Sequence, residues 1–364
     1  MAVRRLAARG FRNLEEIELG LADGVTLVTG PNGAGKTNLL EALYFGLTGT
    51  SWRTRNQRQL IRFGAELARV KLRLDDGDER RELVAAVGRT EGRSHRLDGN
   101  PVSAWEEAGR PPVGVFAPDR LELVKGAPTA RRAHLDRFVA ALWPARAEPR
   151  RRFVNALAQR NALLGRVRAR AAAPSALDAW DLELAVEGVA LMGARREAVE
   201  ALAPTFAELA GELGLGGGAE LRYAPRSDAA APEQLVAELR ERRDGDLERG
   251  YTGYGPHLDE LAISLAGRSV RRYGSQGEQR LALLALLFAE RAALLEGHPS
   301  PPVMLLDDVM SELDTARRRL LTELLAGGGQ ALITATEPEQ LPAGSARREV
   351  GVRNGALAPF AVAA

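Results

Sequence analysis

The feature that most constrains this chain is a glycine-rich loop between two runs of different character, in the stretch VTLVTGPNGAGKTNLLEALYFGL. Residues 25–29 predict a short strand, whereas residues 38–47 carry helix-forming apolar residues and predict a helix. Between them, residues 30–37 read G-x-x-x-x-G-K-T. A strand that passes through this loop into a helix is the context of a phosphate-binding P-loop. The chain therefore predicts an α/β fold with a nucleotide site.

Each position of this loop has an expected task, although a chance match in a glycine-rich turn is the alternative. Glycines let backbone N–H groups turn inward around a phosphate without Cβ clashes. Lys36 would reach the β- and γ-phosphates of ATP, and Thr37 would offer its hydroxyl to Mg²⁺. Lys36 is one of only three lysines in the chain, and its compact ammonium suits a phosphate cradle better than a planar guanidinium. The residues expected to bind ATP are Gly30, Pro31, Asn32, Gly33, Ala34, Gly35, Lys36 and Thr37.

Two aspartates follow a second predicted strand. Residues 303–306 form a continuous apolar run, which is typical of a strand buried on both faces of a mostly parallel sheet. Asp307 and Asp308 come at its carboxyl end, where open α/β sheets bind their ligands. We expect Asp307 to share the Mg²⁺ site with Thr37, and Asp308 to orient or deprotonate the attacking water. A turn that merely caps the next helix is the alternative.

A further buried strand is predicted at residues 331–336, with threonines near its end. In related sheets the equivalent edge carries a polar residue that senses the γ-phosphate. Thr334 or Thr336 is therefore a candidate sensor, and an ordinary strand end is the alternative.

The composition narrows the class of protein. Of the 364 residues, 45% are hydrophobic and 27% are charged, which is typical of globular proteins, and the length allows two or three domains. Cysteine is absent, which excludes disulfides and thiolate zinc sites. The longest apolar run, residues 281–289, is far shorter than the roughly 20 residues of a membrane span. We expect a cytoplasmic protein with no membrane association.

The turn GSQGEQR, residues 274–280, opens directly onto a long apolar helix. Free backbone N–H groups and a serine hydroxyl at a helix start form an anion site, but no lysine follows to strengthen it. The P-loop and the carboxylate strand leave the outer face of a γ-phosphate open. We expect this turn to supply the missing wall.

The turn resembles the signature motif of ABC-type ATPases, L-S-G-G-Q, and departs from it at the first, third and fifth positions. SELD, residues 311–314, is similar to the D-loop of the same fold. The resemblance implies that the turn caps a nucleotide held by a second subunit, so that two protomers share each ATP. It implies nucleotide contacts from Ser275, Gly277 and Glu278, with Ser275 acting in catalysis together with Lys36, Asp307 and Asp308.

Longer stretches resemble the RecF family of bacterial recombination mediators. LAARGFRNLEEIEL, FAPDRLELVKGAPTARRAHLD, YTGYGPHLDEL and LLDDVMSELD occur in that family's order over roughly the whole chain. The resemblance implies an ATP-dependent homodimer on DNA at single-strand gaps, with a weak, DNA-stimulated ATPase. It also implies partnership with RecR and RecO in gap repair, replication-fork maintenance and SOS induction. Asp308 is one methylene shorter than the glutamate common in transporters, so we expect slow turnover.

These observations predict an ABC-type P-loop ATPase head with a mixed β-sheet lobe and an inserted helical lobe. Residues 68–74 alternate strictly and Asp98-Gly99 is a hairpin signal, so the first part of the chain is strand-rich. Helical patterning takes over from about residue 130 and is expected to break at Pro144, Pro149, Pro174 and Pro204. We expect lobe I to comprise residues 1–117 and 300–364, and lobe II, which carries the signature turn, residues 118–299.

Positive charge is unevenly placed along the chain. Residues 119–170 hold twelve arginines and one lysine against four acidic residues. A smaller group comprises Arg53, Arg55, Arg58 and Arg62. Each group is either a solvated face or a contact to the DNA backbone. Because no aromatic ladder interleaves the arginines, duplex DNA or a single/double-strand junction is the expected partner.

Two rival functions remain open from the sequence. One is the ATPase subunit of an ABC transporter, which would usually have a shorter interval between P-loop and signature than the one from Lys36 to Ser275. The other is a DNA-binding scaffold whose ATP site is not catalytic. ATP turnover measured with and without DNA separates the scaffold from a switch.

Overall fold

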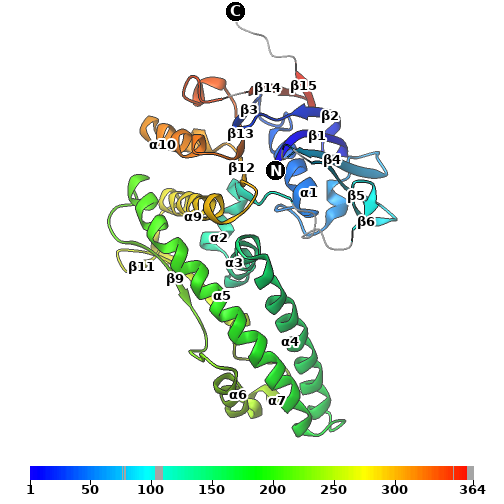
Figure 1. Cartoon of the computed structure of the whole chain (residues 1–364), viewed down its shortest axis with the longest axis vertical. Helices are drawn as coiled ribbons and strands as arrows, with labels where there is room; N and C mark the ends of the chain where they lie inside the picture. Colours follow the sequence, from blue (N-terminus) through cyan, green and yellow to red (C-terminus); the bar gives the residue numbers. More distant parts are fainter. Residues whose placement is uncertain (76, 78, 103–109, 347, 359–364) are drawn as a thin grey trace, which may run out of the picture. The chain divides into compact units, whose positions relative to one another are not determined.

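The computed structural model describes residues 1–75, 77, 79–102, 110–346 and 348–358. The chain divides into two compact units. Unit 1 comprises Met1–Arg120 and Leu294–Ala364, and unit 2 comprises Leu121–Ala293. Figure 1 labels many of the helices and strands of both units. Unit 1 is thus assembled from two segments separated by the whole of unit 2.

The first sheet of unit 1 is mixed, with the strand order β15-β14-β3-β13-β12-β8. Its neighbours pair in parallel except at β15, which pairs antiparallel with β14. The predicted strand at residues 303–306 is confirmed, and the one predicted at 331–336 lies one residue earlier. The strands are β3 (Val25–Thr29), β8 (Val113–Phe116), β12 (Val303–Leu306), β13 (Gln330–Ala335), β14 (Arg348–Arg353) and β15 (Ala356–Ala358).

The second sheet of unit 1 is antiparallel, with the order β2-β1-β4-β5-β6-β7. Residues 68–74 alternate between buried and more exposed positions, as predicted. The hairpin at Asp98 and Gly99 is also confirmed, and both residues have positive φ, as a type I′ turn requires. The strands are β1 (Ala2–Phe11), β2 (Leu14–Gly20), β4 (Leu67–Asp75), β5 (Arg80–Gly88), β6 (Gly92–Leu97) and β7 (Asn100–Pro101).

Helix α1 (Lys36–Thr48) lies in the core of unit 1 and contacts strands of both sheets. Its apolar side chains belong to one continuous buried cluster with those of β1, β4 and β12. Gly46 permits a close approach to β4, since a Cβ there would lie 2.8 Å from side-chain atoms of Leu72. The remaining helical elements of unit 1 are η1 (Gln57–Leu60), η7 (Val309–Glu312), α10 (Thr315–Ala326) and η8 (Pro338–Gln340).

Unit 2 combines helices with a small antiparallel sheet of order β11-β10-β9. Its longest helix, α5, has 36 residues, or about 54 Å at 1.5 Å per residue. Its helices are α2 (Glu122–Lys125), α3 (Pro128–Leu142), η4 (Pro144–Arg146), α4 (Ala147–Arg168), η5 (Pro174–Ala176), α5 (Leu177–Glu212), α6 (Pro232–Glu241), α7 (Arg243–Arg249), η6 (Pro256–Leu258) and α8 (Val270–Tyr273). Its strands are β9 (Ala219–Ala224), β10 (Glu260–Leu265) and β11 (Arg268–Ser269). Two further elements cross the unit boundaries, η3 (Pro118–Leu121) and α9 (Gln276–Gly297).

Two of the predicted helix breaks are wrong. Pro149 lies in the first turn of α4, where the missing N–H would have no helical partner anyway. Pro204 lies inside α5, which continues through it. Leu202 and Phe206 on either side of Pro204 are buried, so tertiary packing holds the helix together across the lost hydrogen bond.

Candidate functional site

The P-loop joins β3 to α1, as its spacing predicts. Gly30 has φ 151°, and a Cβ at this position would lie 2.2 Å from the carbonyl oxygen of Val352, so only glycine fits. Lys36 Nζ donates to the carbonyl oxygens of Gly30, at 2.6 Å, and Pro31, at 3.2 Å. Burial lowers the pKa of Lys36, and nearby carboxylates oppose that shift. The Lys36 side chain therefore folds back over the P-loop and bonds to two of its carbonyl oxygens.

Asp307 lies beside the P-loop helix. Thr37 Oγ1 is 2.9 Å from each of its carboxylate oxygens, and Thr334 Oγ1 donates to Oδ1 at 2.8 Å. Burial raises the pKa of the Asp307 carboxyl, and the hydrogen bonds from Thr334 and Thr37 oppose that rise. The structure thus brings together the two predicted metal ligands, Thr37 and Asp307, from opposite ends of the chain.

Asp308 has a strained backbone conformation, with φ 50°. Its N–H donates to Thr334 Oγ1 at 2.9 Å, whereas its Oδ1 is buried without a hydrogen-bond partner in the described part of the chain. The Thr334 hydroxyl therefore joins the two aspartates, and it is fully buried. Thr336, the other candidate sensor, is only partly buried, and its N–H donates to Gln340 Oε1 at 3.1 Å.

The donor set at this position suits Mg²⁺. A hydroxyl and a carboxylate are hard oxygen ligands, and the unpartnered Oδ1 of Asp308 offers another oxygen to a cation or its water. No group of three or more His, Cys, Asp or Glu side chains placed to hold a metal occurs among the described residues. A magnesium ion between Thr37 and Asp307 would therefore complete its shell with water and phosphate oxygens, as in other P-loop proteins.

The signature turn forms a capping box at the start of α9. Ser275 N–H donates to the Glu278 carboxylate at 2.7 Å, and Glu278 N–H donates to Ser275 Oγ at 3.2 Å. Hydrogen bonding of the Glu278 carboxylate to the Ser275 N–H, and then to the Ser275 side chain, lowers the pKa of Glu278. Gly277 is exposed. All three residues belong to unit 2, whereas the P-loop and the two aspartates belong to unit 1.

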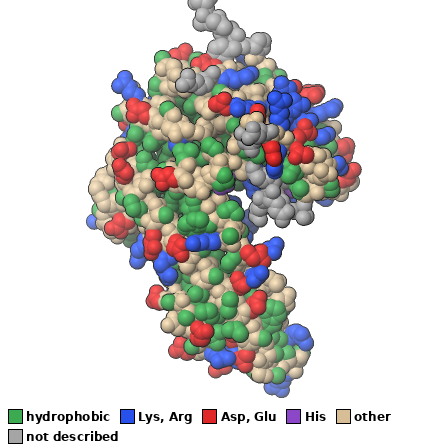
Figure 2. All heavy atoms as spheres, viewed as in Figure 1, with side chains coloured by type: hydrophobic (Ala, Val, Ile, Leu, Met, Phe, Trp, Pro, Cys, Tyr) green, Lys and Arg blue, Asp and Glu red, His purple; other side chains and the backbone are tan. Residues whose placement is uncertain are grey.

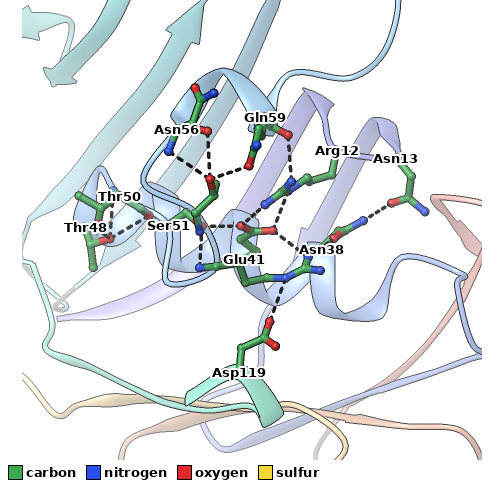
Figure 3. A network of polar contacts seen from close by, with 12 residues as sticks. Arg12, Asn13, Asn38, Glu41, Thr48, Thr50, Ser51, Asn56, Gln59 and Asp119 are labelled. Carbon is green, nitrogen blue, oxygen red and sulfur yellow. Dashed lines mark hydrogen bonds and ion pairs between the residues drawn. The ribbon is translucent and has the colours of Figure 1, made fainter. Parts of the chain in front are cut away.

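A fully buried carboxylate on α1, Glu41, holds a polar network beside the P-loop (Figure 3). The Arg12 guanidinium donates to both of its oxygens, at 2.9 and 2.8 Å. Ser51 Oγ donates to Glu41 at 2.6 Å, and Arg53 Nη1 does so at 3.2 Å. A carboxylate that is buried away from water is stable only when hydrogen bonds and positive charges compensate for its lost hydration. The network therefore ties α1 to the segment after β1 and to the loop after α1.

Asparagines extend the network to the P-loop itself. Asn38 Nδ2 donates to Asn13 Oδ1 at 2.8 Å, and Asn13 Nδ2 donates to the carbonyl oxygen of Gly33 at 3.4 Å. The sequence reasoning missed Arg12, Asn13 and Glu41. The available signal was one charged residue, Glu41, inside an otherwise apolar helical run.

Much of the basic segment at residues 119–170 is neutralised within unit 2. Arg160 is fully buried and forms ion pairs at 2.7 Å with Asp181 and Asp246. Further pairs join Arg131 to Glu260, Arg146 to Glu197, Arg150 to Asp136, and both Arg151 and Arg152 to Glu148. Most of these carboxylates lie outside the segment, so a local count overstates its free charge.

The smaller arginine group, Arg53, Arg55, Arg58 and Arg62, also contains both ion-paired and exposed side chains. Arg53 lies within 4 Å of the carboxylates of Glu41 and Asp119, and Arg62 pairs with Glu15 at 3.1 Å. Arg55 and Arg58 are exposed. The group therefore contributes to the network around α1 as well as to the surface.

A P-loop, a Thr–Asp pair beside it and a separate signature turn define an ATPase head of the ABC/SMC class. The chain belongs to the RecF branch of the RecF/RecN/SMC N-terminal domain family, whose family model matches residues 2–356. The predicted family and fold class are confirmed.

Relatives with curated descriptions match over nearly their full length. The DNA replication and repair protein RecF of Anaeromyxobacter sp. (strain Fw109-5) is 39% identical over 348 residues, covering 93% of each chain. That of Streptomyces avermitilis is 38% identical over 358 residues, covering 94% of this chain and 95% of the relative.

Solved structures agree with this assignment. A structure of the recombination mediator RecF with ATP, in the RecFOR pathway, has a TM-score of 0.90 at 26% identity, covering 99% of this chain and 98% of that one. An Smc head bound to the C-terminal winged-helix domain of ScpA, at 19% identity, has a TM-score of 0.60, covers 98% of this chain and 96% of that one, and shows a shared fold.

We predict that Glu41→Ala destabilises unit 1 by about 3 kcal/mol, because it leaves Arg12 and Arg53 without their buried counter-charge. The midpoint of thermal unfolding measures the loss. Glu15→Ala is the matched control, since Glu15 pairs with Arg62 at 81% side-chain exposure and such pairs contribute less than about 1 kcal/mol. Equal shifts for the two variants would contradict a structural role of Glu41.

Proposed function

We propose that this protein is an ATP-dependent DNA-binding protein of recombinational DNA repair. ATP drives its dimerisation on DNA, and slow hydrolysis reverses it. The contact between Thr37 and Asp307 at the foot of the P-loop carries the nucleotide part of the proposal. The match to RecF proteins over nearly the whole chain supports the DNA-repair part.

In the proposed site each residue acts on a defined part of the nucleotide. Residues 30–35, apart from Pro31, which has no N–H, surround the β-phosphate with backbone N–H groups, and Lys36 contacts the β- and γ-phosphates. Thr37 and Asp307 would hold Mg²⁺, which would supply positive charge against the phosphate oxygens. Asp308 orients or deprotonates the attacking water, and the buried hydroxyl of Thr334 fixes its backbone through the bond to its N–H.

The other wall of the site comes from a second protomer. Ser275, Gly277 and the start of α9 would face the γ-phosphate bound by the partner's P-loop. ATP then joins two protomers, and a ligand that binds only the dimer must shift the monomer–dimer equilibrium toward it. Hydrolysis removes that ligand and releases the dimer.

The family suggests where this ATP-dependent dimerisation would act. We propose that the dimer binds duplex DNA or a single/double-strand junction at single-strand gaps. There it would act with RecR and RecO in gap repair, replication-fork maintenance and SOS induction. ATP turnover that rises with added DNA would support this reading over a scaffold with a non-catalytic ATP site.

The transporter alternative has less support. The relatives at 39% and 38% identity are DNA replication and repair proteins. An ATPase subunit of a transporter would need a separate membrane partner for its activity. Within the described residues, no helix is long and apolar enough to cross a membrane, and this alone does not separate the two readings.

We predict that Lys36→Ala and Ser275→Arg each abolish turnover but complement each other when mixed. In a shared site, every mixed dimer has one intact interface, formed by Lys36 of one variant and Ser275 of the other. Random pairing would make half of the dimers mixed, and pairing driven by the one intact site would make nearly all of them mixed, so turnover should recover to about a quarter to a half of the wild-type value. Steady-state ATP hydrolysis measures this recovery.

Two controls sharpen the mixing experiment. Each variant mixed with itself should stay inactive, and monomeric Ser275→Arg should still bind ATP, because its own P-loop is intact. No recovery in the mixture, despite dimers detected by light scattering, would refute a site shared between protomers.

We predict that Asp308→Asn binds ATP and stays dimeric but hydrolyses ATP at least about a hundredfold more slowly, because the general base is lost. Asparagine tolerates the left-handed backbone of this position, so the fold should be kept. Single-turnover hydrolysis and light scattering measure the two effects. Unchanged hydrolysis would remove Asp308 from the chemistry.

We predict that Glu278→Gln tightens ATP-driven dimerisation roughly threefold to tenfold at low salt, because the Glu278 carboxylate competes with phosphate at the start of α9. A glutamine can still accept from Ser275 N–H, so the capping box is kept. Glu296→Gln, an exposed change near the far end of α9, is the control. Weaker dimerisation of Glu278→Gln would show instead that the carboxylate is needed.

A further inference from the structure

The antiparallel sheet of unit 1 places like charges directly opposite each other. In the register between β1 and β4, Arg5 pairs with Arg73 and Arg9 pairs with Arg69. Their neighbours Leu6 and Leu72 are buried, so these arginines occupy the outward face. Like charges directly opposite on neighbouring strands destabilise a sheet. Two such pairs on one face call for a compensating negative charge.

The chain itself supplies only part of that charge. Arg5 pairs with Glu18 on β2, and Lys71, which lies between the two pairs on β4, bonds Glu82 on β5 at 2.6 Å. Glu16 on β2 lies opposite Arg9 in the strand register. These three acids flank the arginines on the neighbouring strands.

Three arginines are left over. Arg9, Arg69 and Arg73 are exposed, and none of their side chains makes a hydrogen bond or ion pair within the described residues. We call Arg5, Arg9, Arg69, Lys71 and Arg73 together the cationic face. Figure 2 shows Lys and Arg side chains gathered over this part of unit 1. Residues 119–170 differ in this respect, because six of the twelve arginines there form ion pairs with carboxylates of the described part of the chain.

We propose that the cationic face binds the phosphate backbone of duplex DNA. Arg5 and Arg9 are four residues apart on β1, which is about 13 Å along an extended strand. The major groove is about 12 Å wide, so the two opposed pairs are spaced to contact phosphates on both of its edges. Arginine is suited to this task because its guanidinium binds phosphate through two parallel hydrogen bonds.

The outward face favours nucleic acid over an anionic lipid surface. A membrane-binding face sets apolar side chains beside its cations. Here the other residues of that face next to the cations are Ala7, which is small, and Val84 and Ala86, which are buried. A regular backbone of phosphates therefore fits the cationic face better than a bilayer does.

This inference rests on the proposed DNA binding and assigns it to a surface. The double variant Arg9→Gln/Arg69→Gln removes one opposed pair and leaves the nucleotide site untouched. Binding to a labelled duplex, with ATP and at several salt concentrations, should weaken on the order of tenfold near 0.15 M salt, and the log–log salt slope should fall by about 2. ATP-driven dimerisation should not change.

The matched control is Arg222→Gln/Arg268→Gln, which removes two exposed strand arginines from unit 2 and should keep duplex affinity within about twofold. The thermal midpoint of Arg9→Gln/Arg69→Gln should rise or stay constant, because repulsion between the paired arginines is relieved. Weakened binding in a destabilised variant would instead indicate lost folding and would overturn the inference.

The remaining outcomes separate this inference from the proposed function. If the wild-type protein binds duplex and the double variant binds it equally well with the same salt slope, the cationic face is not the DNA surface. If the wild-type protein binds no DNA with or without ATP, the proposed function itself fails. If it binds phosphatidylserine vesicles but not duplex, the face belongs to a lipid surface and the inference is overturned.

Discussion

The structure of unit 1 depends on the burial of α1 between two sheets. The P-loop leads into this helix, so the positions of the loop residues, Lys36 and Thr37 depend on how the helix is held. Apolar contacts with β1, β4 and β12 fix it in the core, and the bonds of Glu41 to Arg12 fix it to the segment after β1. A site built on a buried helix is rigid, which is what recognition of a triphosphate by fixed backbone dipoles requires.

Local sequence explains why the P-loop conformation and the contact between Thr37 and Asp307 could be predicted. The P-loop spacing lies in eight consecutive residues, and Asp307 follows a buried strand whose carboxyl end had to reach the ligand edge of the sheet. The proximity of Thr37 and Asp307 followed from these two facts alone. The loop residues 30–35 needed no knowledge of distant contacts.

The features that could not be predicted share a cause, because each depends on residues that lie far away in the sequence. The role of Glu41 depends on Arg12 and Ser51, which only the folded chain brings to its carboxylate. In the sequence it is one charged residue in a predicted helix. The charge of residues 119–170 appeared free because most of its neutralising carboxylates come from other segments of unit 2. The alternation of residues 68–74 predicts one buried face. The other face carries Arg69, Lys71 and Arg73, and Arg69 and Arg73 lie opposite arginines of β1. That pairing depends on the strand register, which the sequence alone does not fix.

The arrangement of the mixed sheet bears on synthesis of the chain. Strand β3, which leads into the P-loop, has β13 and β14 as its neighbours, and these come some 300 residues later. On the ribosome, residues 121–293 emerge and can fold as a unit long before the P-loop strand has anything to pair with. Until residues 330–353 have emerged, the apolar strand β3 has no neighbouring strand with which to pair. A nascent chain halted before that point therefore carries the complete nucleotide loop but not the sheet that shapes it.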